Sequence, residues 1–419
     1  MNNSRPGFSE MMKAVGPGIL FAGAAIGVSH LVQATRAGAG YGFHLLWAVV
    51  LVLLFKYPFF QYAHRYTVAT GESLLEGYGR QGRWALAAFM VVVAASSFIT
   101  LAAVTVVTAG LAVSLLGLSL SLPMVSLLIL VVVGAILMVG RYGALDLLMK
   151  IMVLVLGLLV LVAVGLAFRH GPAGDPSYTH PAIFSSVGLT FLLALMGWMP
   201  APLEIGAWSS LWVLEKNKGH KKPPTMLQAM VDYNLGYAAT VVLALAFVSF
   251  GALVMYGTGT EFSPRAVRFS AQLVEMFTST LGQWSRWVIT MVAFITMFST
   301  TLTVLDGYSR TLSVGLPLVS GRASGRSRPS YLFFLLLLMV LSVLIIAFFM
   351  TNMKTLIDVV TVLAFLTAPL VAMLNFRVVR GENMPEEHRP GPIMTGLSWA
   401  GIVFLLGFGL VWIVVRWVI

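Results

Sequence analysis

The fold is decided by the stretch from Ala194 to Glu204, which reads Ala-Leu-Met-Gly-Trp-Met-Pro-Ala-Pro-Leu-Glu. It places two prolines, a glycine and a carboxylate in the middle of a long apolar segment. Proline removes a backbone amide donor and clashes with the preceding turn, so we expect a helix to break near 197–202. Freed backbone groups are tolerated at bilayer depth only when they are buried in protein or line a polar cavity. The stretch therefore predicts a broken membrane helix beside a cavity.

The rest of the chain is equally apolar. Of its 419 residues, 59% are hydrophobic and 10% are charged, whereas a soluble domain carries about 25% charged residues. Apolar runs long enough to cross the ~30 Å hydrocarbon layer as helices recur throughout, and they lack the alternation of a barrel strand. We therefore expect an all-α integral membrane protein with eleven spans, at 15–34, 43–64, 84–115, 123–140, 147–168, 184–213, 226–256, 287–309, 330–351, 355–376 and 395–416.

The basic residues predict an orientation. With the N-terminus inside, eighteen Lys and Arg residues fall on the cytoplasmic side and seven on the other side, with Lys56 within a span. Because basic residues favour cytoplasmic loops, we expect a cytoplasmic N-terminus and an external C-terminus, in the plasma membrane (the inner membrane if bacterial). Basic residues spread over loops in this way argue against nucleic acid as a partner. From its polar N-terminal residues we expect no cleavable signal peptide.

The first span resembles the sixth in being unsuited to a regular helix. Residues 16–30 are rich in glycine and small side chains and end in the polar pair Ser29-His30. The two unusual spans lie five helices apart, as in transporters built from inverted repeats, whose substrate site lies between two discontinuous helices. We therefore expect one domain, 1–419, with repeats at 15–168 and 184–376, an extra helix at 395–416, and breaks at 25–30 and 197–202. Ordinary Pro/Gly kinks are the alternative interpretation.

These features resemble the NRAMP (natural-resistance-associated macrophage protein) family of proton-coupled divalent metal transporters, which have the LeuT-type fold. The similarity runs from Gly16-Pro17-Gly18 through Leu45-Leu46-Trp47 and Arg65 to Thr70-Gly71. It resumes at Met199-Pro200, at Ser299–Thr303 and at Ala368-Pro369-Leu370. The resemblance thus covers nearly the whole chain and implies the fold and the orientation.

The residues that the family uses to bind metal are largely replaced. The family's first-helix motif is Asp-Pro-Gly-Asn, whose Asp and Asn bind metal, and the same positions here read Gly27-Val28-Ser29-His30. The family's sixth helix carries Ala-x-x-Met-Pro-His, with a backbone carbonyl and a thioether as ligands, and here it reads Met196-Gly197-Trp198-Met199-Pro200-Ala201. Only Met199 carries over, and residues 84–115 contain no Asp or Glu in place of the family's acidic residues.

Candidate site residues follow from the two breaks. We expect the substrate to be bound by Gly27, Ser29, His30, Met196, Gly197 and Met199, with His30 and Met199 as ligands if the substrate is a metal. Ionisable groups inside a membrane are functional candidates, so gating or coupling falls to Glu204, Asp232, Asp306 and Arg36, with Asp358 as a further gating candidate. His30 and Glu204 could instead be hydrogen-bonded structural residues. Lys56 is expected to extend to the membrane surface.

We expect a secondary transporter rather than a channel or an enzyme. No span shows the long polar stripe of a channel, and no phosphate-binding loop or catalytic constellation is present. The absence of cysteine excludes disulfides and thiol chemistry. We expect a monomer without a cofactor that moves a small ion. The resemblance slightly favours a divalent or soft transition metal, and a small anion or polar molecule is the alternative because the metal-binding Asp is missing. Transport of Mn²⁺ should be poor.

Overall fold

The computed structural model describes residues 16–139, 142–217, 224–321, 327–348 and 352–417, and the elements within these ranges are helices. The connectors at 218–223 and 322–326, which carry part of the charge asymmetry, lie outside them. In chain order the helices are α2 (Pro17–Ala25), the π-helical η1 (Ser29–Ala34), α3 (Thr35–Tyr41), α4 (Leu46–Thr70), α5 (Leu74–Arg80), α6 (Arg83–Leu116), α7 (Leu122–Val139), α8 (Tyr142–His170), α9 (Ser186–Gly197), α10 (Ile205–Asn217), α11 (Met226–Val254), α12 (Ala266–Leu281), α13 (Ser285–Val319), α14 (Arg328–Phe348), α15 (Met353–Val378), the 3-10 helix Glu386–His388 and α16 (Pro392–Trp417).

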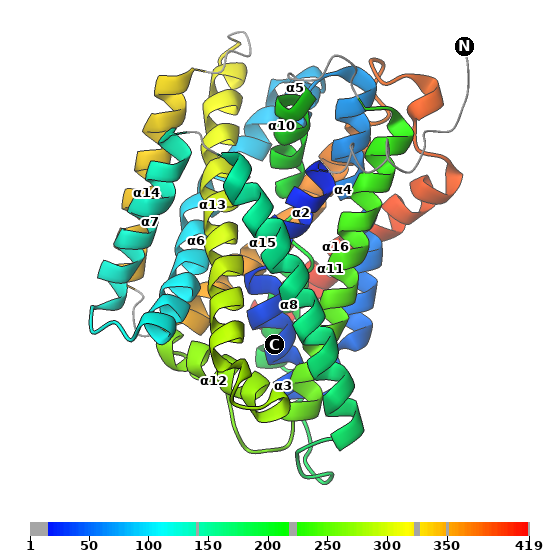
Figure 1. The fold of residues 1–419 in the computed structure, drawn as a ribbon. Helices are drawn as coiled ribbons and strands as arrows, with labels where there is room; N and C mark the ends of the chain where they lie inside the picture. Colours follow the sequence, from blue (N-terminus) through cyan, green and yellow to red (C-terminus); the bar gives the residue numbers. More distant parts are fainter. Residues whose placement is uncertain (1–15, 140–141, 218–223, 322–326, 349–351, 418–419) are drawn as a thin grey trace.

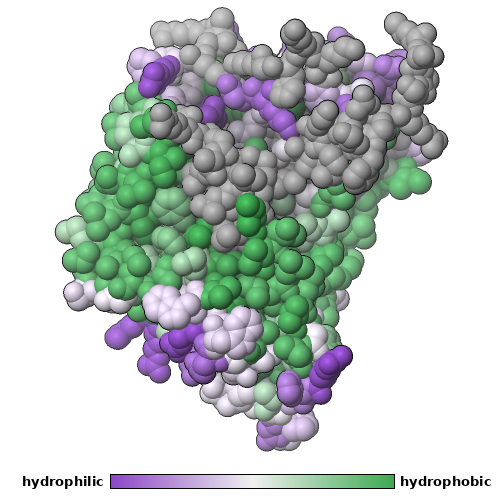
Figure 2. Space-filling view, in the orientation of Figure 1, coloured by the Kyte–Doolittle hydropathy of each residue, from purple (hydrophilic) through white to green (hydrophobic). Residues whose placement is uncertain are grey.

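Nine of the described helices are long and apolar enough to cross a membrane. Two further crossings are made by broken pairs, α2 with η1 and α3, and α9 with α10. In Figure 2 an apolar belt separates two polar ends of the molecule, as expected for a chain whose waist faces lipid. The protein is therefore an all-helical membrane protein, and the expected spans are present.

The helix ends differ from the expectation where polar residues continue a helix beyond the apolar run. Helix α4 runs to Thr70 rather than to residue 64, and α13 runs to Val319 rather than to residue 309. The amphipathic helix α12, which the apolar runs did not indicate, packs against α6 and α13. Its buried side chains include Phe269, Leu273 and Phe277, which recur at the helical spacing of three to four residues.

The two broken helices lie inside the bundle (Figure 1). Helix α2 packs on α11 and α13, and α9 packs on α15. Glycine permits the closest contacts: a β-carbon at Gly236 of α11 would lie 2.1 Å from the carbonyl oxygen of Gly18 in α2. Small residues allow membrane helices to approach in this way. The broken helices are therefore held by backbone contacts with continuous neighbours.

Candidate substrate site

The first helix breaks after Ala25. Ile26 has ψ near 83°, outside the helical range, and the chain resumes as η1 at Ser29. At the break, a β-carbon on Gly27 would lie 2.8 Å from the Thr300 side chain of α13. Glycine is therefore required for this approach, and the expected break at 25–30 is confirmed.

The sixth span breaks after Gly197, and α10 begins at Ile205, which confirms the expected break at 197–202 and extends it to residue 204. Gly197 packs directly on α15, because a β-carbon there would lie 1.8 Å from the carbonyl oxygen of Thr361. The break leaves the last carbonyls of α9 without helical partners.

Lys56 of α4 binds these carbonyls. Its Nζ donates to the carbonyl oxygens of Met196 at 2.8 Å, Gly197 at 2.7 Å and Ala201 at 3.3 Å, and the side chain is fully buried. The expectation that Lys56 extends to the membrane surface was wrong. Since α4 continues to Thr70, Lys56 lies about 15 Å from the start of the helix and farther from its end, beyond the reach of its side chain to either surface.

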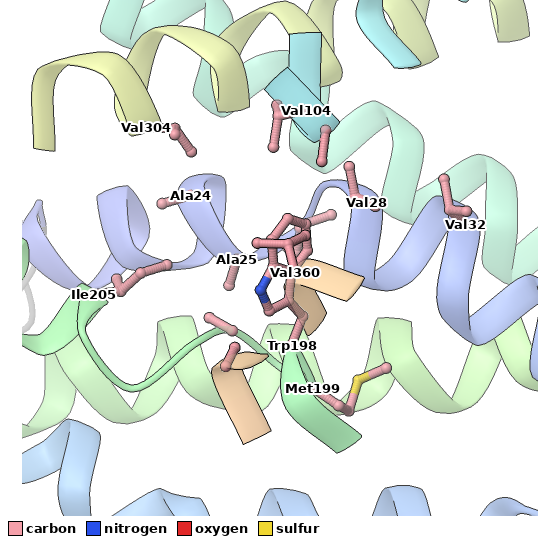
Figure 3. Close-up of a cluster of buried hydrophobic side chains, with 14 of the residues drawn as sticks. Ala24, Ala25, Val28, Val32, Val104, Trp198, Met199, Ile205, Val304 and Val360 are labelled. Atoms are coloured by element: carbon pink, nitrogen blue, oxygen red, sulfur yellow. The ribbon is translucent and has the colours of Figure 1, made fainter. Parts of the chain in front are cut away.

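The two breaks face each other across a small cavity of about 20 Å³, which is enough for roughly one water molecule. Figure 3 shows the Trp198 indole placed in the gap between Ala25 and Val28 of the broken first helix. The lining is mostly apolar, and its polar side chains are Ser29, Thr100, Thr300, Trp198 and Trp208.

Both indoles carry a donor with no partner among the described residues. Trp198 Nε1 and Trp208 Nε1 are buried, and neither N–H donates to an acceptor there. The hydroxyls are already engaged: Ser29 Oγ donates to the Ala25 carbonyl at 2.6 Å, and Thr300 Oγ1 donates to the Thr296 carbonyl at 3.0 Å. The cavity therefore offers N–H donors in an apolar setting.

His30 lies behind the cavity wall. Its Nε2 donates to the Thr240 carbonyl of α11 at 3.0 Å, and its Nδ1 lies 2.7 Å from Ser29 Oγ. The ring also packs edge-on against Phe247, with centroids 6.5 Å apart. Because Nε2 binds the Thr240 carbonyl, the imidazole fastens η1 to α11, and a metal at Nε2 would have to displace this bond.

Of the other residues expected at the site, Ser29 lines the cavity, whereas the side chains of Met196 and Met199 are buried outside its lining. Figure 3 shows the Met199 thioether directed away from the Trp198 ring. No group of three or more His, Asp and Glu side chains within the described ranges could hold a metal ion. The binding roles of these residues stay predictions.

The acidic candidates are all engaged by donors. Glu204 accepts from Ser96 Oγ of α6 at 2.8 Å and from Tyr308 Oη of α13 at 2.7 Å. Asp232 of α11 accepts from the backbone amides of Gly16 at 2.9 Å and Gly18 at 2.7 Å, at the start of α2. Carboxylates at a helix N-terminus are favourable because the helix dipole is positive there.

Asp306, in the interior of α13, accepts from three different donors. It accepts from Arg310 at 2.7 Å, Trp212 at 3.1 Å and Tyr331 at 2.8 Å. These contacts join α13 to α10 and α14 and involve none of the residues that line the cavity.

Arg36 and Asp358 lie at the edge of a much larger space. A vestibule of about 1020 Å³ opens beside α3 and α15, and both side chains line it. Arg36 pairs with Asp358 at 2.7 and 3.0 Å. Behind the pair, Gln33 donates to Asp358 and to Thr361 Oγ1 at 3.2 and 3.3 Å. Thr361 in turn contacts Gly197, so a chain of polar contacts leads from the vestibule to the α9 break.

Two facing broken helices between continuous ones define a secondary transporter of the LeuT-type fold. Comparison with known proteins gives the same class. The profile of the family described as natural resistance-associated macrophage protein-like matches residues 18–415. The chain belongs to this family, which consists of transporters rather than enzymes.

Relatives and solved structures are consistent with the assignment. The uncharacterized protein PM0681 of Pasteurella multocida (strain Pm70) is 37% identical over 404 residues, which cover 96% of this chain and 92% of that protein. Metal transporter Nramp6.2 of Populus trichocarpa is 32% identical over 89 residues, 20% of this chain and 16% of its own length.

The solved structures share the fold at low identity. A manganese transporter of Eremococcus coleocola superposes with a TM-score of 0.74 at 13% identity, covering 99% of this chain and 88% of its own. MhsT in complex with L-phenylalanine superposes at 0.64 and 12% identity, covering 96% of this chain and 98% of its own. The two structures show the fold with different small ligands.

Proposed function

We propose that this transporter carries a small organic solute with an oxygen acceptor, such as a carboxylate or an amide, rather than a metal ion. The main observation behind this proposal is that Trp198 and Trp208 line the cavity between the breaks. Their indole N–H groups have no partner among the described residues. A buried donor left unpaired costs about 1–3 kcal/mol. A solute whose oxygen accepts from an indole would recover this free energy.

The lining also disfavours a metal. A dication at bilayer depth needs anionic oxygen ligands to offset its dehydration, and no Asp or Glu lines the cavity. At the position where the family places its aspartate, a β-carbon on Gly27 would clash with Thr300. The carbonyl of Met196, which the resemblance assigns to metal binding, accepts from Lys56 instead. Loss of the carboxylate should cost several kcal/mol, and each 1.4 kcal/mol is tenfold in affinity.

A metal cargo is the second candidate, because the chain belongs to the family and Nramp6.2 is described as a metal transporter. Both candidates require alternating access. The cavity is too small for an organic solute in this conformation, so loading requires movement of the Trp198 ring and of the polar contacts beside the vestibule.

We assign Arg36 and Asp358 to the gate on the vestibule side, since their ion pair lines the vestibule and contacts Gln33, which reaches Thr361 beside the α9 break. We assign Asp232 to the gate on the opposite side, since it fastens the start of α2 to α11. Glu204 and Asp306 are coupling candidates: they join the broken sixth span to α13 through Tyr308 and Trp212.

The first prediction concerns the cargo. In proteoliposomes we expect no saturable Mn²⁺ uptake above that of protein-free vesicles. In a thermal-shift panel of small carboxylates, amides and amino acids, a stabilising compound should bind about tenfold more weakly to Trp198→Phe, which keeps the ring and removes the N–H donor. Trp399→Phe is the matched control, because Trp399 lies on α16 and is 47% exposed. Saturable Mn²⁺ uptake that Trp198→Phe leaves unchanged would contradict the proposal.

The second prediction concerns the gate. The native chain has no cysteine, so a Ser29→Cys protein carries one reactive thiol at the cavity. Asp358→Asn removes the partner of Arg36 and should speed thiol labelling of that cysteine roughly fivefold, the effect of about 1 kcal/mol from a partly exposed ion pair. Glu72→Gln, which breaks the pair with Arg80 outside the vestibule, is the control and should leave the labelling rate unchanged. An equal rate in the Asp358→Asn protein would refute the assignment.

The third prediction concerns orientation, which we propose from the charge asymmetry to be N-terminus inside with the vestibule facing out. In intact cells, an impermeant thiol reagent should label Ser177→Cys, in the exposed segment after α8, and should not label Glu386→Cys, in the exposed turn before α16. The reverse labelling pattern would invert the topology.

A further inference from the structure

Each N–H donor of the Lys56 ammonium group has one backbone carbonyl as its acceptor. An ammonium has three N–H donors, and Nζ contacts three backbone carbonyls, those of Met196, Gly197 and Ala201. All three belong to the broken segment of the sixth span, and the side chain that reaches them is fully buried. The carbonyls therefore form a cage around one cation.

The charge of this environment also favours a cation. Met196 and Gly197 are the last residues of α9, where the helix dipole is negative. Converging carbonyl oxygens are the ligands with which proteins replace the hydration shell of free alkali and alkaline-earth ions. The same cage without the lysine would be a site for a free cation.

We propose that the Lys56 ammonium is a resident cation, tethered to α4, that occupies a cation site made by the end of α9. The chain thereby holds its broken sixth span without a free ion, and the ammonium keeps small cations out of the cage. This inference deepens the proposed function, because it explains why a site beside a helix break takes no metal.

A lysine that only pinned α4 to α9 would also destabilise the protein when replaced. The two roles differ in one property. If the carbonyls form a cation site, truncation of Lys56 should let them bind a small cation from solution. If Lys56 only links α4 to α9, the truncated protein should not respond to cations. The discriminating readout is therefore rescue by a soluble ammonium ion rather than loss of stability.

The fourth prediction tests this property by thermal unfolding of the purified protein in choline chloride, methylammonium chloride or potassium chloride. In choline we expect Lys56→Ala to unfold roughly 5 °C or more below the parent, and methylammonium should recover most of this loss in a saturable manner, because a ligand bound only to the folded state stabilises it. Potassium should act more weakly, since it lacks the N–H donors. The parent, whose cage is filled, should not respond.

Two further variants sharpen the test. Lys56→Met fills the same space with a neutral chain and should be as destabilised as Lys56→Ala without any recovery in methylammonium. Arg65→Ala is the matched control on the same helix, since Arg65 also donates to backbone carbonyls, at His388 and Arg389, but in a turn away from the break. It should show no response to methylammonium.

The proposal is overturned if Lys56→Met is as stable as the parent, or if methylammonium does not stabilise Lys56→Ala. A Lys56→Ala protein that cannot be purified in a folded state, in methylammonium chloride as well as in choline chloride, also contradicts the proposal, since methylammonium should restore the fold. None of these readouts uses a transported solute. Failure here therefore leaves the cargo question open, and a failed search for an organic solute leaves the cage intact.

Discussion

The structure around the breaks depends on the contact between one buried ammonium and the carbonyls that end α9. A helix interrupted inside a bilayer exposes backbone groups that lipid cannot satisfy, and an unpaired buried polar group costs free energy. Lys56 supplies three donors at once, and α4, which carries it, is a continuous helix of 25 residues. With its carbonyls satisfied, the sixth span can remain open from Trp198 to Glu204, and the Trp198 indole can enter the gap that the first helix leaves.

The same contact shapes the chemistry of the site. Lys56 Nζ binds the Met196 carbonyl, which the family resemblance assigns to metal binding, and the opposite wall offers Gly27 with no room for a side chain. What remains is an apolar cavity with indole donors, and an ion pair lines the vestibule nearby. Family membership thus establishes the fold and the transport class, while the different cargo that we propose rests on the side chains at the breaks.

The spans and both breaks could be predicted from the sequence, because apolar runs and Pro/Gly clusters act locally. The partners of the polar residues could not, because they come from distant parts of the chain: His30 contacts Thr240, and Arg36 contacts Asp358, 322 residues away. Lys56 was misjudged because its helix was expected to end at residue 64, which placed the lysine near a surface. The position of Trp198 could have been predicted to matter, because its indole lies inside a predicted break. That its N–H has no acceptor could not be predicted, because this depends on neighbouring hydroxyls that already bind other groups.

The central claim is that the end of α9 holds the Lys56 ammonium and no metal ion. Anomalous diffraction at the manganese edge, from crystals of the unmodified protein grown with MnCl₂, tests it most directly. The account predicts no manganese peak between the breaks and density for the Lys56 side chain on the carbonyls of Met196, Gly197 and Ala201. A manganese peak at metal–ligand distance, about 2–2.6 Å from the Met196 carbonyl oxygen, with Lys56 turned away, would contradict it.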